Sequence, residues 1–199
     1  MRNHLRPLFD RVVVKELEPD RIRQSGLLVP AGTHEPPPQH GIVLAVGPGL
    51  DWWEHVGVQM PVKPGDHVVF PASAGAWVEV DEERLLVCRV GELLGVLETV
   101  RHQLRPLFDR VVVKELDQDR VRRSGLVVPP GSHDPPPQQG IVLAVGPGLD
   151  WWEQAGVEMP VEPGDHVVFP ASAGAWVEVD EERLLVCRVG ELLGVLESA

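Results

Sequence analysis

Short apolar runs separated by Gly, Pro and Asp dominate the hydrophobic pattern of the chain. β-Branched residues bounded by turn formers favour β-strands, and each run has the length of one strand. AWVEV alternates between apolar and polar positions, whereas VVV is apolar on both faces, as in a barrel wall that is covered on both sides. The pattern therefore predicts an all-β fold, a small irregular β-barrel. In the first half of the chain the runs are VVV (12–14), GIVLAVG (41–47), DHVVF (66–70), AWVEV (76–80), RLLVCRV (84–90) and LLGVL (93–97).

Three segments depart from the strand pattern. VGELLGVLE (90–98) has an approximate helical period, but Gly95 in its centre costs about 1 kcal/mol relative to Ala, so we expect one helical turn and then a final strand. Residues 16–40 form a long polar stretch, and residues 48–64 form a second excursion with two adjacent tryptophans. Long connections within a compact domain are usually functional or disordered. We therefore look for function in these two segments.

The second half of the chain repeats the first. LRPLFDRVVVKEL at 5–17 returns at 104–116, and residues 64–98 are identical to residues 163–197. The repeat predicts a first domain at 1–98, a linker at 99–103 and a second domain at 104–199. A linker of about five residues spans at most ~17 Å. The end of the first domain must therefore lie beside the start of the second domain.

Composition and charge narrow the class of protein. The chain has 199 residues, of which 43% are hydrophobic, and its formal net charge is -12. Such an acidic chain without a basic block is not expected to bind nucleic acid or an anionic membrane. The absence of a long apolar run and of a signal-like start predicts a cytoplasmic protein. Cys88 and Cys187 lie in apolar strands, and we expect two packed thiols rather than a disulfide.

The order of several motifs resembles a known family. RPLFDRVVVK, a Gly followed by three aliphatic residues and Pro, GIVLAVGPG, PGDHVVF and ELLGVLE together closely resemble the co-chaperonins of the GroES type, and the resemblance covers nearly all of both copies. It implies two GroES-like β-barrels, each with a mobile loop and a roof hairpin, in a ring that caps a GroEL-type chaperonin in a nucleotide-dependent way around non-native substrate proteins. No enzyme activity and no cofactor of its own are implied, since ATP would be bound by the chaperonin.

The resemblance places the chaperonin-binding residues in residues 16–40 and their repeat. Each loop contains three consecutive aliphatic residues, here called the triplet. The residues around each triplet are polar and show no periodicity that would bury it. The alternative is that the triplet folds back onto its own barrel. Burying each aliphatic side chain is worth about 1.5 to 3 kcal/mol, whereas ordering a loop costs about 1 to 2 kcal/mol per residue. One loop alone should bind weakly, and several loops on one ring should bind together. The loop residues are Gly26, Leu27, Leu28, Val29, Gly125, Leu126, Val127 and Val128.

The second excursion falls where the family carries the roof hairpin. If the segment is a strand, its two tryptophans point to opposite faces, so that one packs on the barrel and the other meets a neighbour or a substrate. Local packing of both is the alternative. The residues are Trp52, Trp53, Trp151 and Trp152.

In family rings, the first strand of one subunit pairs with the last strand of the next, which covers open sheet edges. The resemblance therefore implies a homo-oligomer in which the fusion makes one such contact within the chain. The sequence does not decide between rings of six, seven and eight domains. Because each chain supplies two domains, a ring of seven would need a single-domain co-chaperonin as partner. The expected interface residues are Leu5, Pro7, Leu8, Leu94, Val96, Leu104, Pro106, Leu107, Leu193 and Val195.

Other chemistry finds less support in the sequence. His34 and His40 flank the triproline at 36–38 and are a possible pair of metal ligands. The second copy has Gln139 in the place of His40, so we expect exposed loop histidines instead of a metal site. The triproline lacks the spacing of an SH3 ligand, and a stiff polyproline segment would instead lower the cost of ordering the loop. No catalytic or phosphate-binding motif is present. The alternative to a co-chaperonin is a β-barrel interaction module that reuses the fold.

Overall fold

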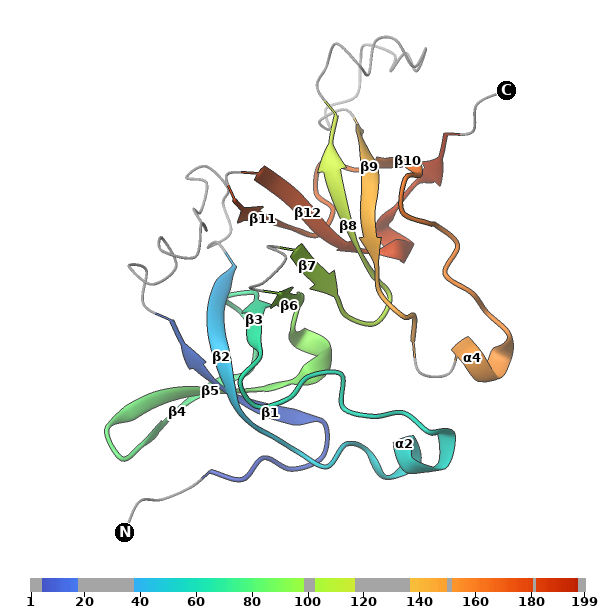
Figure 1. The fold of residues 1–199 in the computed structure, drawn as a ribbon. Helices are drawn as coiled ribbons and strands as arrows, with labels where there is room; N and C mark the ends of the chain where they lie inside the picture. The colour runs from blue at the N-terminus through green and yellow to red at the C-terminus, as the bar shows by residue number, and fades with distance from the viewer. Residues whose placement is uncertain are drawn as a thin grey trace.

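The computed structural model describes residues 5–17, 38–98, 103–116, 137–149, 152–180 and 182–196. Within them the chain forms two antiparallel sheets with very little helix, one sheet for each half of the sequence (Figure 1). The all-β prediction is confirmed. The two halves share the same order of elements because they share nearly the same sequence.

The first domain is built on six strands of its own. The strands pair in the order β4-β5-β1-β2-β3-β6, every pair is antiparallel, and the helix lies in the connection between β2 and β3. The expected helical turn before the last strand is present as the 3-10 helix η1. The bounds are β1 Arg11–Glu16, β2 Gln39–Val46, α2 Asp51–Val56, β3 His67–Phe70, β4 Ala76–Val80, β5 Glu83–Arg89, η1 Val90–Glu92 and β6 Gly95–Glu98.

The second domain repeats this arrangement with one addition, a strand that precedes it. Strand β7 leaves the second domain and joins the sheet of the first, and the remaining strands pair in the order β11-β12-β8-β9-β10-β13. The bounds are β7 Gln103–Pro106, β8 Arg110–Glu115, β9 Gln138–Val145, α4 Trp152–Ala155, β10 His166–Phe169, β11 Ala175–Val179, β12 Glu182–Arg188, η2 Val189–Glu191 and β13 Gly194–Val195.

A β-bulge bends each domain at the same place. In the first domain Val13 pairs with Ala45 and Val14 pairs with Val43, so that Leu44 is the extra residue, and Leu143 is its counterpart in the second domain. Both leucines are 43% exposed. A bulge leaves one residue unpaired and increases the local twist, which helps a short sheet to curve into a barrel. The bulge explains why an aliphatic side chain in an apolar strand points to solvent.

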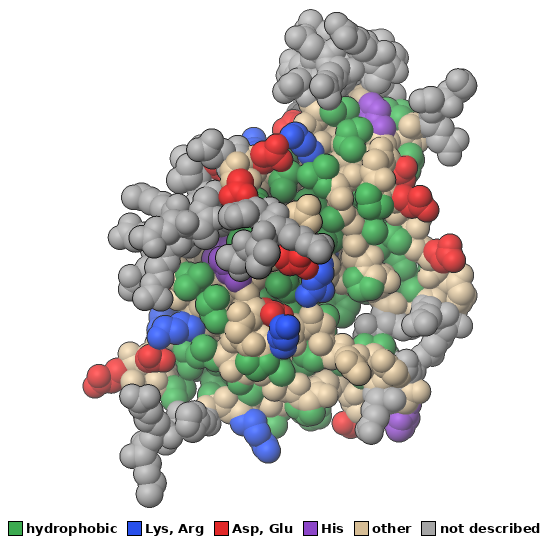
Figure 2. All heavy atoms as spheres, in the orientation of Figure 1, with side chains coloured by type: hydrophobic (Ala, Val, Ile, Leu, Met, Phe, Trp, Pro, Cys, Tyr) green, Lys and Arg blue, Asp and Glu red, His purple; other side chains and the backbone are tan. Residues whose placement is uncertain are grey.

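Valines supply most of the two barrel cores. Val12, Val14, Val68 and Phe70 are fully buried in the core of the first domain, and the same alternation fills the second. Side chains of alternate residues point to one face of a strand, so the apolar runs place every second residue inside. On the face shown in Figure 2, the basic side chains are interspersed with acidic ones and form no basic patch among the described residues. None of the helices in the described ranges is long and apolar enough to cross a membrane.

Candidate interaction site: the domain junction and its two open ends

The two domains are joined by an antiparallel pair of strands. Strand β6, the last of the first domain, pairs with β7, the first of the second domain, with Val96 opposite Arg105 and Leu97 opposite Leu104. The short linker predicts this proximity of the two domains, and residues 99–102 between the strands lie outside the described ranges. The backbone groups at the edge of β6 are thereby paired with a strand from the other domain.

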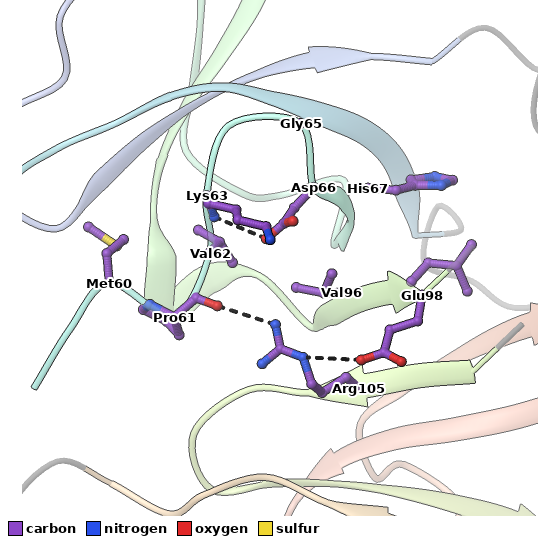
Figure 3. A pocket seen from close by; sticks show the side chains of 11 residues that line it. Met60, Pro61, Val62, Lys63, Gly65, Asp66, His67, Val96, Glu98 and Arg105 are labelled. Carbon is purple, nitrogen blue, oxygen red and sulfur yellow. Dashed lines mark hydrogen bonds and ion pairs between the residues drawn. The ribbon is translucent and has the colours of Figure 1, made fainter. Parts of the chain in front are cut away.

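Arg105 anchors the hairpin to the first domain. Its Nη2 donates a hydrogen bond to the Pro61 carbonyl oxygen at 3.3 Å, and its Nε lies 3.8 Å from a Glu98 carboxylate oxygen (Figure 3). The Arg105 and Glu98 side chains are 44% and 40% exposed, so their ion pair adds little stability. Lys63 and Arg105 line the same cavity of about 550 Å³, which gives this site two basic groups.

Leu107 inserts from the second domain into the core of the first. It is fully buried in the same apolar cluster as Val12, Val90 and Leu93. Three residues further on, Arg110 donates a hydrogen bond from Nη2 to the Gly91 carbonyl oxygen at 2.9 Å. Burial of a leucine side chain is worth about 1.5 to 3 kcal/mol. Leu107 therefore completes a core that the first domain's own sequence leaves unfilled.

A second apolar cluster spans the junction. It combines residues of the first domain and of the hairpin with residues on the outer face of the second domain's sheet, where Val177 and Val179 of β11 are buried. The matching residues of the first domain, Val78 and Val80 of β4, are only half-buried. The buried members of the cluster are Val69, Leu94, Leu97, Leu104, Val112, Val177, Val179, Leu184 and Val186.

The N-terminal segment of the chain is an uncovered copy of the junction strand. Residues 5–11 and 104–110 have the same sequence, LRPLFDR, yet Leu5 and Leu8 are 36% and 54% exposed whereas Leu104 and Leu107 are 4% and 0% exposed. Pro7 is buried, as is Pro106. Identical side chains thus differ in burial because one set has a neighbouring domain and the other does not.

The C-terminal edge of the second domain is uncovered in the same way. Leu193 and Val195 are 62% and 37% exposed, whereas their counterparts Leu94 and Val96 are 7% and 5% exposed. Strand β13 pairs with β10 in the register that β6 has with β3, but no strand lies on its outer side among the described residues. The N-terminal segment and β13 lie at opposite ends of the molecule (Figure 1).

The core of the second domain is also less well covered than the core of the first domain. Val90 and Leu93 are 1% and 0% exposed around Leu107, whereas Val189 and Leu192 are only partly buried against the core of the second domain. No described residue fills the place of Leu107 in that core. In the described residues, the second domain therefore leaves its apolar core partly open beside Val189 and Leu192, and we call this place the open seat.

Part of the tryptophan excursion, Asp51–Val56, is helix α2, so Trp52 and Trp53 lie on a helix and not on a strand. Helix α2 buries Trp53, which is 4% exposed, and leaves Trp52 45% exposed; the two rings lie edge to face at 6.2 Å. Gly49, with φ of +96°, allows the close approach, because a Cβ there would lie 2.8 Å from the Trp53 ring. Trp152 is half-buried at the start of α4, and Trp151 lies outside the described residues.

The prediction of exposed loop histidines is wrong for His40. Strand β2 begins at Gln39, so His40 points from the strand into the protein, where it is 1% exposed and lies edge to face with His67 at 5.5 Å. Burial, and then the neighbouring His67, lowers the pKa of His40 to about 3. Burial lowers the pKa of His67 as well. The alternation that continues from Ile42 back to His40 is the sequence signal that identifies this position.

The histidine pair has no metal-binding geometry among the described residues. Nδ1 of His40 and Nε2 of His67 are buried without a hydrogen-bond partner, but the described ranges hold no group of three or more metal-binding side chains. His34 lies outside these ranges. The second domain has Gln139 in the place of His40, also buried.

The two cysteines are free and buried, as the sequence predicts. Burial, and then the nearby Glu92 and Glu191 respectively, raises the pKa of Cys88 and of Cys187 to about 12. Reactivity of a cysteine requires the thiolate. Both thiols are therefore inert packing groups.

The aliphatic triplets and the glycines before them lie in 18–37 and 117–136, outside the described residues. The structure does describe the base of each segment. The Leu17 amide donates a hydrogen bond to the His40 carbonyl oxygen, and the Leu116 amide donates one to that of Gln139, both at 2.9 Å. Each segment therefore begins and ends at adjacent points, where β1 meets β2 and β8 meets β9.

Two small barrels of one design, fused so that the last strand of one pairs with the first strand of the other, define the class of a duplicated co-chaperonin. The family model for the chaperonin 10 kDa subunit matches the chain twice, at residues 4–97 and 103–196. The chain belongs to this family.

Relatives of two kinds are similar to the chain. The chloroplastic 20 kDa chaperonin of Spinacia oleracea is 32% identical over 197 residues, covering 96% of this chain and 75% of the relative, and that of Arabidopsis thaliana is 30% identical over 194 residues, covering 96% and 76%. The co-chaperonin GroES of Bordetella avium is 46% identical over 94 residues, covering 47% of this chain and 98% of the relative. The predicted tandem duplication is confirmed, and these relatives support a co-chaperonin function.

Proposed function

We propose that the chains assemble end to end by repeating, between molecules, the junction that β6 and β7 make within one molecule. The observation that carries this proposal is the pair of matched open ends. The N-terminal segment exposes Leu5 and Leu8, which are buried as Leu104 and Leu107 at the junction, and the second domain exposes the edge and the core that would receive them. Such head-to-tail contacts close into a ring when the rotation between units permits it.

The assembled ring caps a GroEL-type chaperonin in a nucleotide-dependent way and encloses a non-native substrate protein. Family membership supports the partner, and the triplets at 27–29 and 126–128 supply the aliphatic groups that would bind it. One loop contributes little net free energy, because ordering the loop offsets most of the apolar burial. Two loops on each chain and several chains on each ring make the later contacts intramolecular, so the ring binds tightly while single contacts stay weak.

Serine substitutions in the triplets test this role. The variant with Leu27, Leu28, Leu126 and Val127 changed to Ser should lose capture by purified chaperonin in the presence of ATP, because the apolar area that binds is removed. A variant with only the two substitutions of the first loop, Leu27→Ser and Leu28→Ser, should retain partial capture. Unchanged capture by the four-site variant would contradict the proposed role of the loops, and capture of the wild type that is equal without nucleotide would favour a general interaction module.

The compartment is that of the chaperonin partner. The sequence alone predicts the cytoplasm, whereas the two relatives that match both domains are chloroplastic. Fractionation of the source cells with an antibody to the chain separates these two locations.

A further inference from the structure

The two halves of the chain differ at one position that faces the junction. Lys63 lines the cavity that Arg105 also lines, and the equivalent residue in the second domain is Glu162. The residues are 99 positions apart, and the sequence from 64 to 98 is identical to that from 163 to 197. A basic group is thus replaced by an acidic group in a segment that otherwise repeats closely.

Glu162 occupies the same local structure as Lys63. The backbone amide of Lys63 donates a hydrogen bond to Asp66 Oδ2 at 3.0 Å, and that of Glu162 donates one to Asp165 Oδ2 at 2.9 Å. Both side chains are exposed. Because the turn is the same, the Glu162 carboxylate is presented from the second domain where the Lys63 ammonium is presented from the first.

We infer that Glu162 and Arg6 form the charge contact that selects a second copy of this chain as the occupant of the open end, an inference that rests on the end-to-end assembly proposed above. Arg6 is the counterpart of Arg105 and is exposed. Seated on the second domain of another molecule, Arg6 faces Glu162. Within the molecule, the cavity that Arg105 lines holds Lys63 instead. Among the described residues, the polar partners of Arg105 there are the Pro61 carbonyl oxygen and Glu98.

The junction within the chain combines two basic residues, whereas the proposed junction between chains combines a basic and an acidic residue. The two junctions form under different conditions. Inside the chain the junction strand is tethered to its seat by residues 99–102, so its effective concentration is high and two basic groups in one cavity are tolerated. A free N-terminal strand has no tether and needs an attractive contact to associate.

Charge reversal tests the contact by sedimentation velocity of the full chain at low and high salt. Glu162→Lys should weaken association between chains about tenfold at low salt, because attraction is replaced by repulsion. Lys is already accommodated in this turn at position 63, so the variant should fold. Arg6→Glu should weaken association similarly, and the double variant R6E/E162K should regain most of it. Lys63→Glu is the matched control and should leave association between chains unchanged.

The outcomes separate this inference from the assembly on which it rests. Association of the wild type that does not respond to Glu162→Lys or to salt would overturn the charge contact and leave the assembly standing. Additive losses in R6E/E162K would also overturn the contact between these two residues. A wild-type chain that stays monomeric at all concentrations would overturn the assembly itself.

Discussion

Replacing Leu8 with alanine is expected to weaken association between chains by at least tenfold and to leave the folding of the single chain unchanged. Leu8 is 54% exposed in the single chain, so its truncation removes little buried area. In the proposed assembly it fills the open seat of the next molecule, as Leu107 fills the core of the first domain. Truncation of a buried leucine costs about 2 to 5 kcal/mol. Each junction between chains should lose free energy of that order.

Leu107→Ala is the matched control, because the same residue sits in the same local sequence. Leu107 is 0% exposed, so this variant should lower the free energy of unfolding of the first domain by about 2 to 5 kcal/mol. Hydrogen exchange reports the stability of each domain, and sedimentation reports association. If Leu8→Ala associates as tightly as the wild type, the N-terminal segment does not fill the seat in the second domain. If both variants lower only the stability of their own chain, end-to-end assembly is contradicted.

The same comparison predicts that association stabilises the second domain. Its core lacks the side chain that Leu107 supplies to the first, so in a dilute chain it should unfold more readily than the first domain. Binding that occurs only in the folded state raises stability by mass action. The second domain should therefore gain protection from exchange as the protein concentration rises, whereas the first should change little.

Acidification is expected to destabilise the first domain through His40. An unfolded histidine has a pKa near 6.5, whereas burial holds the pKa of folded His40 at about 3. Below pH 6.5 the unfolded state therefore binds a proton that the folded state does not, so the free energy of unfolding falls as the pH falls, down to about pH 3. From His40 alone, the loss between pH 7.5 and pH 5 should be about 2 kcal/mol. His67, whose pKa is also lowered by burial, adds to the loss.

The charged groups near the pair do not reverse this sign. On the neighbouring strand, Lys15 is 3.0 Å from Glu83 and pairs with it. The cavity that His67 lines also holds Lys63, Asp66, Glu98 and Arg105, but it is burial that lowers the pKa of His67. Among the described residues, His67 is the neighbour whose charge acts on His40, and it lowers the pKa of His40 further. Both influences act in the same direction.

His40→Gln provides the control, since glutamine already occupies the equivalent buried position in the second domain as Gln139. This variant should lose most of the acid sensitivity of the first domain and keep the carboxylate contributions that both proteins share. Denaturant unfolding at pH 7.5, 6 and 5 measures the difference. Parallel pH profiles for the variant and the wild type would show that His40 titrates normally and would contradict its burial. Because the His40 carbonyl oxygen closes the base of residues 18–37, the protection of the Leu17 amide, relative to its intrinsic exchange rate at the same pH, should fall first on acidification.

The sequence predicts the strands well because valine-rich runs bounded by Gly and Pro have few alternatives. It also predicts that the two domains meet, because a short linker leaves little choice of position. It does not predict α2, since a helix of six residues has no measurable period, and the packing of Trp53 against Gly49 stabilises it. His40 is misplaced because the start of β2 falls within a polar segment.

The resemblance assigns the residues of the open ends to an interface, but the local sequence pattern does not show which copy is covered within the single chain. LRPLFDR occurs twice with the same residues, yet one copy is buried at the junction and the other is exposed. Local sequence is identical, so the difference arises only from which neighbour each copy has. For the aliphatic triplets, the resemblance predicts a role in binding the chaperonin. The structure does not test this role, because the triplets lie in residues 18–37 and 117–136, outside the described residues.

Native mass spectrometry of the chain mixed with purified chaperonin and ATP tests the central proposal most directly. The account predicts a chaperonin particle that carries several copies of the chain on one ring, and that loses them all together when nucleotide is removed. A chain that remains monomeric in solution and adds to the chaperonin as single copies, or not at all, would contradict it.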